Sequence, residues 1–395
     1  MKGYIHAMFS STGSWIGNIY DLTIVTYIYV ELEKSYNIGL GAVSLLFSLG
    51  LMGRFFGGLY LGKMTDRNGA KNIMVISTAG YAIFNGIMAF SPDIFILFIA
   101  RFIQGIFMGG EWTSGTVLGY EFSPVSIRST VFGIIQSGYG IGYALTGVAY
   151  LLFLPTMAVN WRYFLITGSI PIIIVPYAIL KVPRDKIEIV RKKVSINKYK
   201  IPLIKSTVIM SSYFAASFSI FSFYPTLAPE FGVPDRIVGL MMILSSITVS
   251  VSFILFGRLA LIIRKRTLII AGALLTALFA WFAMPFLILL RHFELEGFIL
   301  FSAGISSMTI PPLLLMDRIN PEVRGIISGF SYNFGALFGG VISVLLGFIG
   351  NYTGYHFLLL IIDITTLLCL ISVIITGMSI KKLNDSYSYK ANVRL

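Results

Sequence analysis

Cysteine and charged residues are scarce in this chain of 395 residues. The one cysteine, Cys369, excludes an internal disulfide, so the fold must be held together by packing. Charged residues make up 12% of the chain, about half their share in an average soluble domain, which excludes a soluble enzyme. The three histidines lie at the ends of apolar runs, and the sequence has no HExxH or GxSxG motif. We therefore do not expect an enzyme of any kind.

Hydrophobic residues make up 56% of the chain, enough for about eleven or twelve spans of roughly 20 residues each. Apolar runs and helix-breaking residues predict twelve spans, six on each side of a polar segment. The predicted spans are 14–30, 40–61, 73–90, 94–120, 129–154, 162–180, 206–228, 237–257, 267–290, 297–316, 326–350 and 356–380. We expect an all-α membrane protein with an N-terminal six-helix bundle (1–180), a basic cytoplasmic linker (181–205) and a C-terminal six-helix bundle with a short tail (206–395).

The distribution of basic residues predicts the orientation. An even number of spans places both termini on one side of the membrane. If that side is the cytoplasm, most of the 30 Lys and Arg residues are cytoplasmic, and only Lys34, Arg162, Arg236 and Arg291 lie outside. Cytoplasmic segments of membrane proteins are enriched in Lys and Arg, so we predict a multi-pass protein of the cell membrane with both termini in the cytoplasm. The net charge of +13 then reflects topology, and we expect no nucleic-acid partner.

The two halves of the chain align partly with each other at an offset of 195 or 196 positions, which indicates an internal duplication. The matched pairs are Gly62 with Gly257, Lys71 with Arg266, Arg128 with Arg324, and Gly133 with Gly329. Two similar bundles offer one obvious place for a polar path, the interface between them, as in transporters. Glycines four residues apart, such as Gly53 with Gly57 and Gly105 with Gly109, predict close helix packing. Gly57, Gly62 and Lys63 also fit GxxxxGK, but Met64 follows instead of Ser or Thr, so we expect no nucleotide, cofactor or metal.

Two motifs resemble signatures of the major facilitator superfamily. The turn from Gly62 to Lys71 resembles the loop GxxxDRxGRR, with Ala70 where the family prefers Arg, and the segment from Arg101 to Gly105 is similar to RxxQG. A GGEW run at 109–112, followed by Glu121, Pro124 and Arg128, resembles the metabolite/proton symporters, including carboxylate and sialate transporters. The resemblance implies a gate on the cytoplasmic side, made of Gly62, Asp66, Arg67, Gly69, Lys71, Glu121 and Arg128.

Five ionisable side chains fall within predicted spans: Asp21, Arg54, Arg101, Glu111 and Asp363. A charge at the bilayer centre costs about 2.5–3.5 kcal/mol, so each needs a partner or a path to water. From helical rise, Asp21, Arg54 and Glu111 are level, roughly 10–14 Å from the cytoplasmic face, and Arg101 lies about 15 Å further out. Asp21 and Glu111 are candidate proton carriers, because a carboxylate in a partly dry cavity can gain and lose a proton. A structural ion pair between Asp21 and Arg54 is the alternative.

Arg101 is the candidate for binding an anionic substrate, because a guanidinium matches a carboxylate in bidentate geometry; the alternative is a structural bond to helix ends or to Gln104. The resemblance implies a cavity lined by spans one, four, seven and ten. The substrate-binding residues expected there are Arg101, Asn18, Gln104, Tyr213, Ser217, Tyr224, Ser306 and Thr309.

The expected function is secondary active transport: proton-coupled symport of a small organic anion by alternating access, with the chain working as a monomer in the lipid bilayer. The alternative is a uniporter or exporter of a sugar, another metabolite or a drug. The charge of the cavity distinguishes these two functions. A cavity that Arg101 faces would favour an anion, whereas a cavity lined only by Asp21 and Glu111 would favour a cation.

Overall fold

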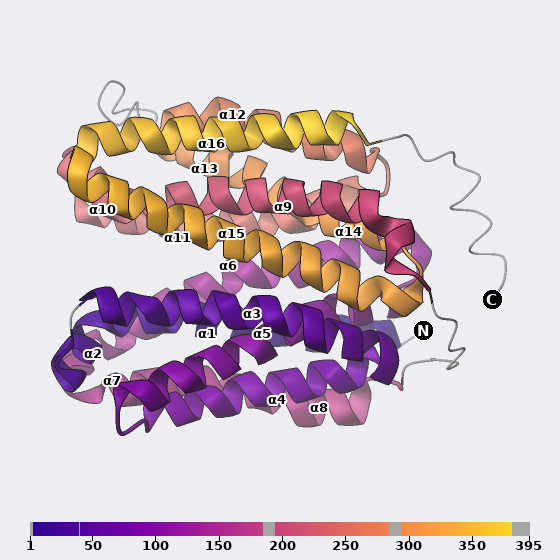
Figure 1. Cartoon of the computed structure of the whole chain (residues 1–395), viewed down its shortest axis with the longest axis horizontal. Helices are drawn as coiled ribbons and strands as arrows, with labels where there is room; N and C mark the ends of the chain where they lie inside the picture. Colours follow the sequence, from indigo (N-terminus) through magenta and orange to yellow (C-terminus); the bar gives the residue numbers. More distant parts are fainter. Residues whose placement is uncertain (1–2, 39, 185–193, 284–293, 381–395) are drawn as a thin grey trace.

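A computed structural model describes residues 3–38, 40–184, 194–283 and 294–380. The regular elements of these residues are all helices, arranged in two stacked lobes (Figure 1). The first lobe contains α1 (Gly3–Ile24), α2 (Tyr29–Tyr36), α3 (Leu40–Asn68), α4 (Ala70–Ala89), α5 (Ile94–Phe122), α6 (Arg128–Phe153), α7 (Met157–Ile166) and α8 (Ile174–Lys181). The second lobe contains α9 (Lys200–Phe221), α10 (Tyr224–Glu230), α11 (Asp235–Leu259), α12 (Lys265–Ala283), α13 (Glu294–Ile305), α14 (Ile310–Met316), α15 (Arg324–Thr353) and α16 (Tyr355–Met378). The lobes meet where α3 packs on α15 and α6 packs on α11.

Within the described residues, nine helical segments are long and apolar enough to cross a bilayer. The all-helical membrane fold is confirmed, whereas twelve spans, a duplicated layout and the three-part division of the chain stay predictions. Part of the predicted span 267–290 and the tail from residue 381 lie outside the described residues.

The largest difference from the predicted spans is at α1, which begins at Gly3 and not near residue 14. The apolar-run criterion missed its first turns because they carry serines, which are buried in the lobe; the Ser11 hydroxyl, for example, donates to the Gly115 carbonyl over 2.8 Å. The predicted span 162–180 is a broken one, in which the 3-10 segment Thr167–Ile173 separates α7 from α8. Pro171 lies in that segment and supplies no N–H for an α-helical bond.

Glycines bring α3 and α5 into close contact, as the pairs in the sequence predict. A Cβ added at Gly57 would collide with the Ile106 carbonyl, and one added at Gly109 would collide with the Arg54 carbonyl. The packing of these helices therefore fixes the position of the α3 residues that face the second lobe.

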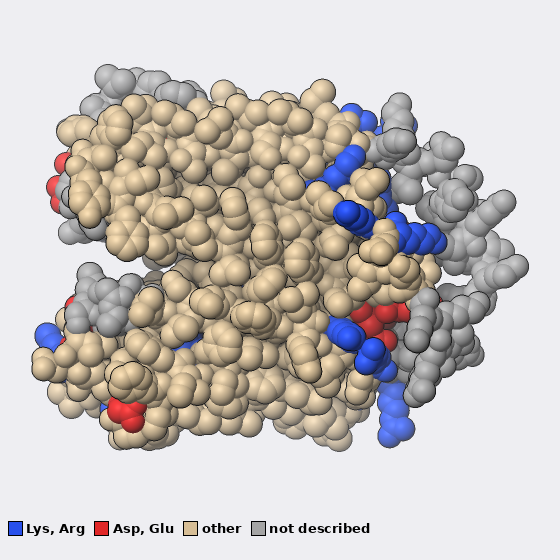
Figure 2. All heavy atoms as spheres, viewed as in Figure 1, with Lys and Arg blue, Asp and Glu red and all other residues tan. Residues whose placement is uncertain are grey.

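Lys and Arg side chains gather at one end of the molecule, where α3 and α5 end and α9 and α15 begin (Figure 2). We call this the basic end. At the opposite end, a notch separates the two lobes (Figure 2). Contacts between the lobes should therefore be densest toward the basic end.

Candidate functional site

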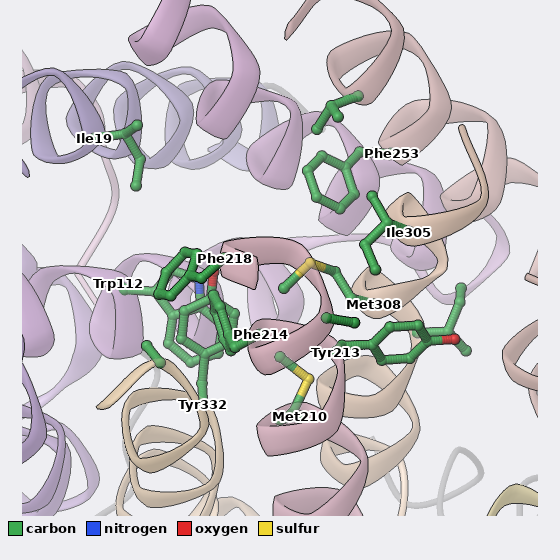
Figure 3. Close-up of a cluster of buried hydrophobic side chains, with 14 of the residues drawn as sticks. Ile19, Trp112, Met210, Tyr213, Phe214, Phe218, Phe253, Ile305, Met308 and Tyr332 are labelled. Atoms are coloured by element: carbon green, nitrogen blue, oxygen red, sulfur yellow. The ribbon is translucent and has the colours of Figure 1, made fainter. Parts of the chain in front are cut away.

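A pocket lies between the lobes, and residues from both lobes line it. Its cavity is narrow in this conformation, with a volume of about 10 Å³, close to what one water molecule needs. The lining residues are Trp15, Ile19, Leu22, Leu51, Arg54, Tyr139, Phe214, Phe218, Tyr332 and Ala336. Figure 3 shows Phe214, Phe218 and Tyr332 gathered beside Trp112 of the other lobe. Arg54 is the one charged residue of this lining.

Arg54 projects from α3 and is 2% exposed. Its Nη1 donates a hydrogen bond of 3.0 Å to Asn18 Oδ1, and its guanidinium lies 5.3 Å from the centre of the Trp15 ring. Its Nε is buried and has no hydrogen-bond partner among the described residues. With Nη1 engaged, the edge formed by Nε and Nη2 is the one that can hold a carboxylate in bidentate geometry.

Asn18 connects Arg54 to Glu111. Its Nδ2 donates to Glu111 Oε2 over 2.6 Å and to the Met108 carbonyl over 2.7 Å. These bonds, with the one from Arg54, fix the orientation of the amide. Glu111 is fully buried and does not line the pocket. The Asn18 side chain lies between it and Arg54, which does. The Arg54 guanidinium and the Glu111 carboxyl group thus share one amide.

Arg101 lies inside the first lobe and not in the lining of this pocket. Its guanidinium donates to the carbonyls of Leu46, Asp21 and Leu22 and to Gln104 Oε1, at 2.7–3.1 Å. The four bonds hold helix ends together, as in the structural alternative for this residue. They leave no edge of the guanidinium facing the second lobe.

Asp21 and Gln104 lie beside Arg101. Gln104 Nε2 donates to Asp21 Oδ2 over 3.2 Å, and Asp21 is fully buried. The prediction that Asp21 is level with Glu111 differs from the structure because α1 begins at Gly3. Asp21 is therefore about 27 Å along the helix at about 1.5 Å per residue, level with Gln104. Arg54 bonds Asn18 in place of the proposed partner Asp21.

The five candidates from the second lobe are buried within that lobe and do not line the pocket. The Tyr213 hydroxyl donates to the Ile269 carbonyl over 3.0 Å and lies 2.7 Å from the Ser307 hydroxyl, and the Tyr224 hydroxyl contacts the Met241 sulfur. Ser306 donates to the Ser302 carbonyl over 2.8 Å. The other two candidates, Ser217 and Thr309, are also buried.

Five aromatic residues of the lining were not among the sequence candidates: Trp15, Tyr139, Phe214, Phe218 and Tyr332. Phe214 and Phe218 are four residues apart and share one face of α9. On α1, Trp15, Ile19 and Leu22 form a similar stripe. Apolar stripes of this kind are the signal that could have found the pocket wall.

The lobes are joined at the basic end by Asp66, near the end of α3. Its carboxylate accepts the backbone N–H groups of Gly325 over 2.6 Å and Ile326 over 2.9 Å. These groups belong to the first turn of α15, so Asp66 caps a helix of the other lobe. Gly62 allows this approach, because a Cβ there would lie 2.9 Å from the Gly325 carbonyl oxygen.

Side chains of α5 add further links. Glu121 forms an ion pair of 2.5 Å with Arg324, and the Tyr120 hydroxyl donates to Asp317 over 2.6 Å. Arg128 and Arg324 lie over the Tyr120 ring, at 4.6 and 4.8 Å from its centre. The basic end is therefore closed in this conformation.

The other predicted gate residues do not cross between the lobes in the contacts described. Lys71 donates to the carbonyls of Ile179 and Val182, within the first lobe. Gly69 has φ of +94°, which turns the chain from α3 into α4 and favours glycine, and Arg67 is exposed.

Comparison with known proteins gives consistent results. The model of the Major Facilitator Superfamily matches residues 8–343. The sialic acid transporter NanX of Escherichia coli K12 is 22% identical, with 91% of this chain and 90% of the relative covered. A probable 4-methylmuconolactone transporter of Cupriavidus pinatubonensis is 26% identical, with 86% of this chain and 82% of the relative covered. A gentisate transporter of Corynebacterium glutamicum is 26% identical over 43% of this chain and 38% of its own length. The solved structure of the proton:xylose symporter XylE matches with a TM-score of 0.74 at 15% identity, covering 95% of this chain and 94% of that one.

Proposed function

Because the chain belongs to the major facilitator superfamily, we propose that it carries a small organic acid across the cell membrane by alternating access, with the pocket between the lobes as the substrate site. The relatives and structural neighbours are transporters and not enzymes. Three relatives are named for sialic acid, 4-methylmuconolactone and gentisate, which supports an organic acid as substrate.

The observation that carries this proposal is Arg54. Among the residues that the structure describes, the buried Nε of Arg54 has no partner, which is costly, and a carboxylate in the pocket would satisfy it. Asp21 and Glu111 do not line the pocket, so its charge is positive and favours an anion over a cation. Arg54 thus takes the role that the sequence assigned to Arg101.

The link between Arg54, Asn18 and Glu111 supports proton coupling. With Glu111 ionised, its charge balances that of Arg54. A substrate carboxylate adds a second negative charge to this region, and a proton on Glu111 restores the balance. Substrate binding and protonation of Glu111 therefore favour each other, which is the coupling that symport requires. Asp21, buried beside Gln104, is the second candidate carrier.

The basic end is proposed to face the cytoplasm, because cytoplasmic segments are enriched in Lys and Arg. Both termini then lie in the cytoplasm, and this conformation is closed on that side. The pocket is complete within one chain, which supports a functional monomer.

The test is uptake of carboxylates, sugars and amino acids into proteoliposomes with an imposed pH gradient. Arg54→Gln removes two charge-assisted hydrogen bonds worth about 1.5–3 kcal/mol each, so the apparent affinity for the transported acid should fall at least about 150-fold. Lys34→Gln, which removes an exposed cation on α2, is the matched control. Uptake of sugars alone, or unchanged affinity in Arg54→Gln, would contradict the proposal.

Glu111→Gln tests the coupling. It should abolish accumulation driven by the pH gradient while exchange of substrate across the membrane continues, and Asp21→Asn is measured in the same way. Accumulation that persists in both variants would point to a uniporter and refute coupling through these carboxylates.

A further inference from the structure

The composition of the pocket wall restricts the kind of acid that fits. Five of its side chains are aromatic: Trp15, Tyr139, Phe214, Phe218 and Tyr332. Four others, Ile19, Leu22, Leu51 and Ala336, are aliphatic. This lining contains no carboxylate and no side-chain amide, and Arg54 is its one cation. The wall therefore provides a place for one negative charge and a large apolar surface for the rest of the ligand.

Part of this wall is flat and held in place. The Tyr332 ring stacks on the Trp112 ring of the other lobe, with centres 3.5 Å apart and planes 14° apart. The Trp112 Nε1 donates to Gln136 Oε1 over 2.9 Å, which fixes the stack. Phe214 meets Tyr332 edge to face, with ring centres 5.1 Å apart and planes at 86°. Flat aromatic walls suit a flat ligand, because aromatic pairs prefer stacked or edge-to-face contacts.

Two N–H groups of the lining residues lack acceptors. Arg54 Nε and Trp15 Nε1 are both buried, and neither has a hydrogen-bond partner among the residues described. The two side chains are in contact, with the guanidinium 5.3 Å from the indole centre. Buried donors are usually paired, so this pair indicates a ligand that accepts hydrogen bonds close to a positive charge.

We propose that the substrate is a planar aromatic monocarboxylate. Its carboxylate binds the Nε edge of Arg54 and accepts a bond from Trp15 Nε1. Its ring packs among Phe214, Phe218 and Tyr332 once these side chains separate, because the cavity of the present conformation has room for about one water molecule. This inference rests on the proposed function of the pocket. A second carboxylate would find no cation in the lining, and the hydroxyl groups of a sugar acid would lose water without gaining matching side chains.

The test compares benzoate with cyclohexanecarboxylate, which has equal charge and similar size, with terephthalate, which has a second carboxylate, and with sialate, a larger sugar acid. Uptake of labelled benzoate by proteoliposomes containing the full chain is measured in the presence of unlabelled benzoate, cyclohexanecarboxylate, terephthalate or sialate. Benzoate should compete at least about tenfold better than cyclohexanecarboxylate, which has the same carboxylate on a puckered ring, and better than terephthalate or sialate.

Trp15→Phe keeps an aromatic ring and removes the N–H, so the affinity for benzoate should fall about tenfold, as for one lost hydrogen bond. Trp161→Phe, a buried tryptophan of α7 in a separate apolar cluster, should leave the affinity unchanged.

Equal competition by cyclohexanecarboxylate, or a preference for sialate, would overturn the aromatic class while Arg54-dependent transport of acids still stood. Unchanged benzoate affinity in Trp15→Phe would show that the Trp15 indole does not donate a hydrogen bond to the substrate. Uptake of none of these four acids would also overturn the aromatic class, whereas the proposed function itself fails if no carboxylate of the wider panel is taken up. The ligand comparison needs no variant, so it holds even if Trp15→Phe does not fold.

Discussion

Replacing Asp66 should open the basic end. Its carboxylate accepts two backbone N–H groups of α15, and it can do so only while the lobes are closed at that end. A side-chain cap contributes about 0.5–2 kcal/mol, and a negative charge at a helix N-terminus adds about 0.3–1 kcal/mol. Asp66→Ala should therefore disfavour the closed conformation by about 1–3 kcal/mol, which changes the ratio of closed to open molecules roughly 5- to 150-fold. Asp66→Asn keeps an oxygen acceptor and should have the smaller effect.

The single cysteine makes this measurable. Cys369→Ser yields a chain without thiols, to which Thr65→Cys adds a reporter at a buried position next to Gly325. The rate of reaction with a small water-soluble thiol reagent should rise at least about fivefold when Asp66→Ala is added. A reporter at the exposed Lys63 should react at the same rate in both backgrounds. If the reporter at residue 65 also reacts at an unchanged rate, the cap does not hold the basic end closed.

Two further predictions concern folding. A lysine in Arg101→Lys cannot replace the four hydrogen bonds of the guanidinium, so the free energy of unfolding should fall by about 3 kcal/mol or more. The midpoint of thermal unfolding should therefore be lower. The substrate affinity of the folded fraction should not change. An unchanged midpoint would contradict a structural role. Gly57→Ala places a Cβ against a backbone carbonyl of α5 and should cost about 1–3 kcal/mol in the same assay. Gly239→Ala, whose Cβ would meet nothing within 4 Å, should leave the midpoint unchanged, and equal midpoints for the two variants would refute the packing argument.

The helices were largely predictable because apolar composition determines which segments can cross a bilayer. The turn at 91–93 was predicted as a break, and there Asp93 caps α5 by accepting the N–H of Ile96 over 2.9 Å. The early turns of α1 were missed because buried serines make them resemble a polar segment. The resulting error of eleven residues in the start of α1 placed Asp21 at the wrong depth.

The pocket was harder to predict, because knowing that a helix lines a cavity does not say which of its faces does so. Arg101 and Gln104 share a face of α5, as expected, but that face contacts α1 within the first lobe. Arg54 projects from α3, a helix that the family resemblance did not place at the cavity. That its Nε has no partner in the described part of the chain emerges only once α1, α3 and α5 are packed together. Rotation of each helix about its axis depends on contacts far apart in the sequence.

A structure of the protein with bound benzoate would test the central claim most directly. The account predicts the carboxylate within hydrogen-bond distance of Arg54 Nε, between the two lobes, with the aromatic ring against Tyr332. A carboxylate bound elsewhere, with Arg54 Nε still lacking a partner, would contradict it.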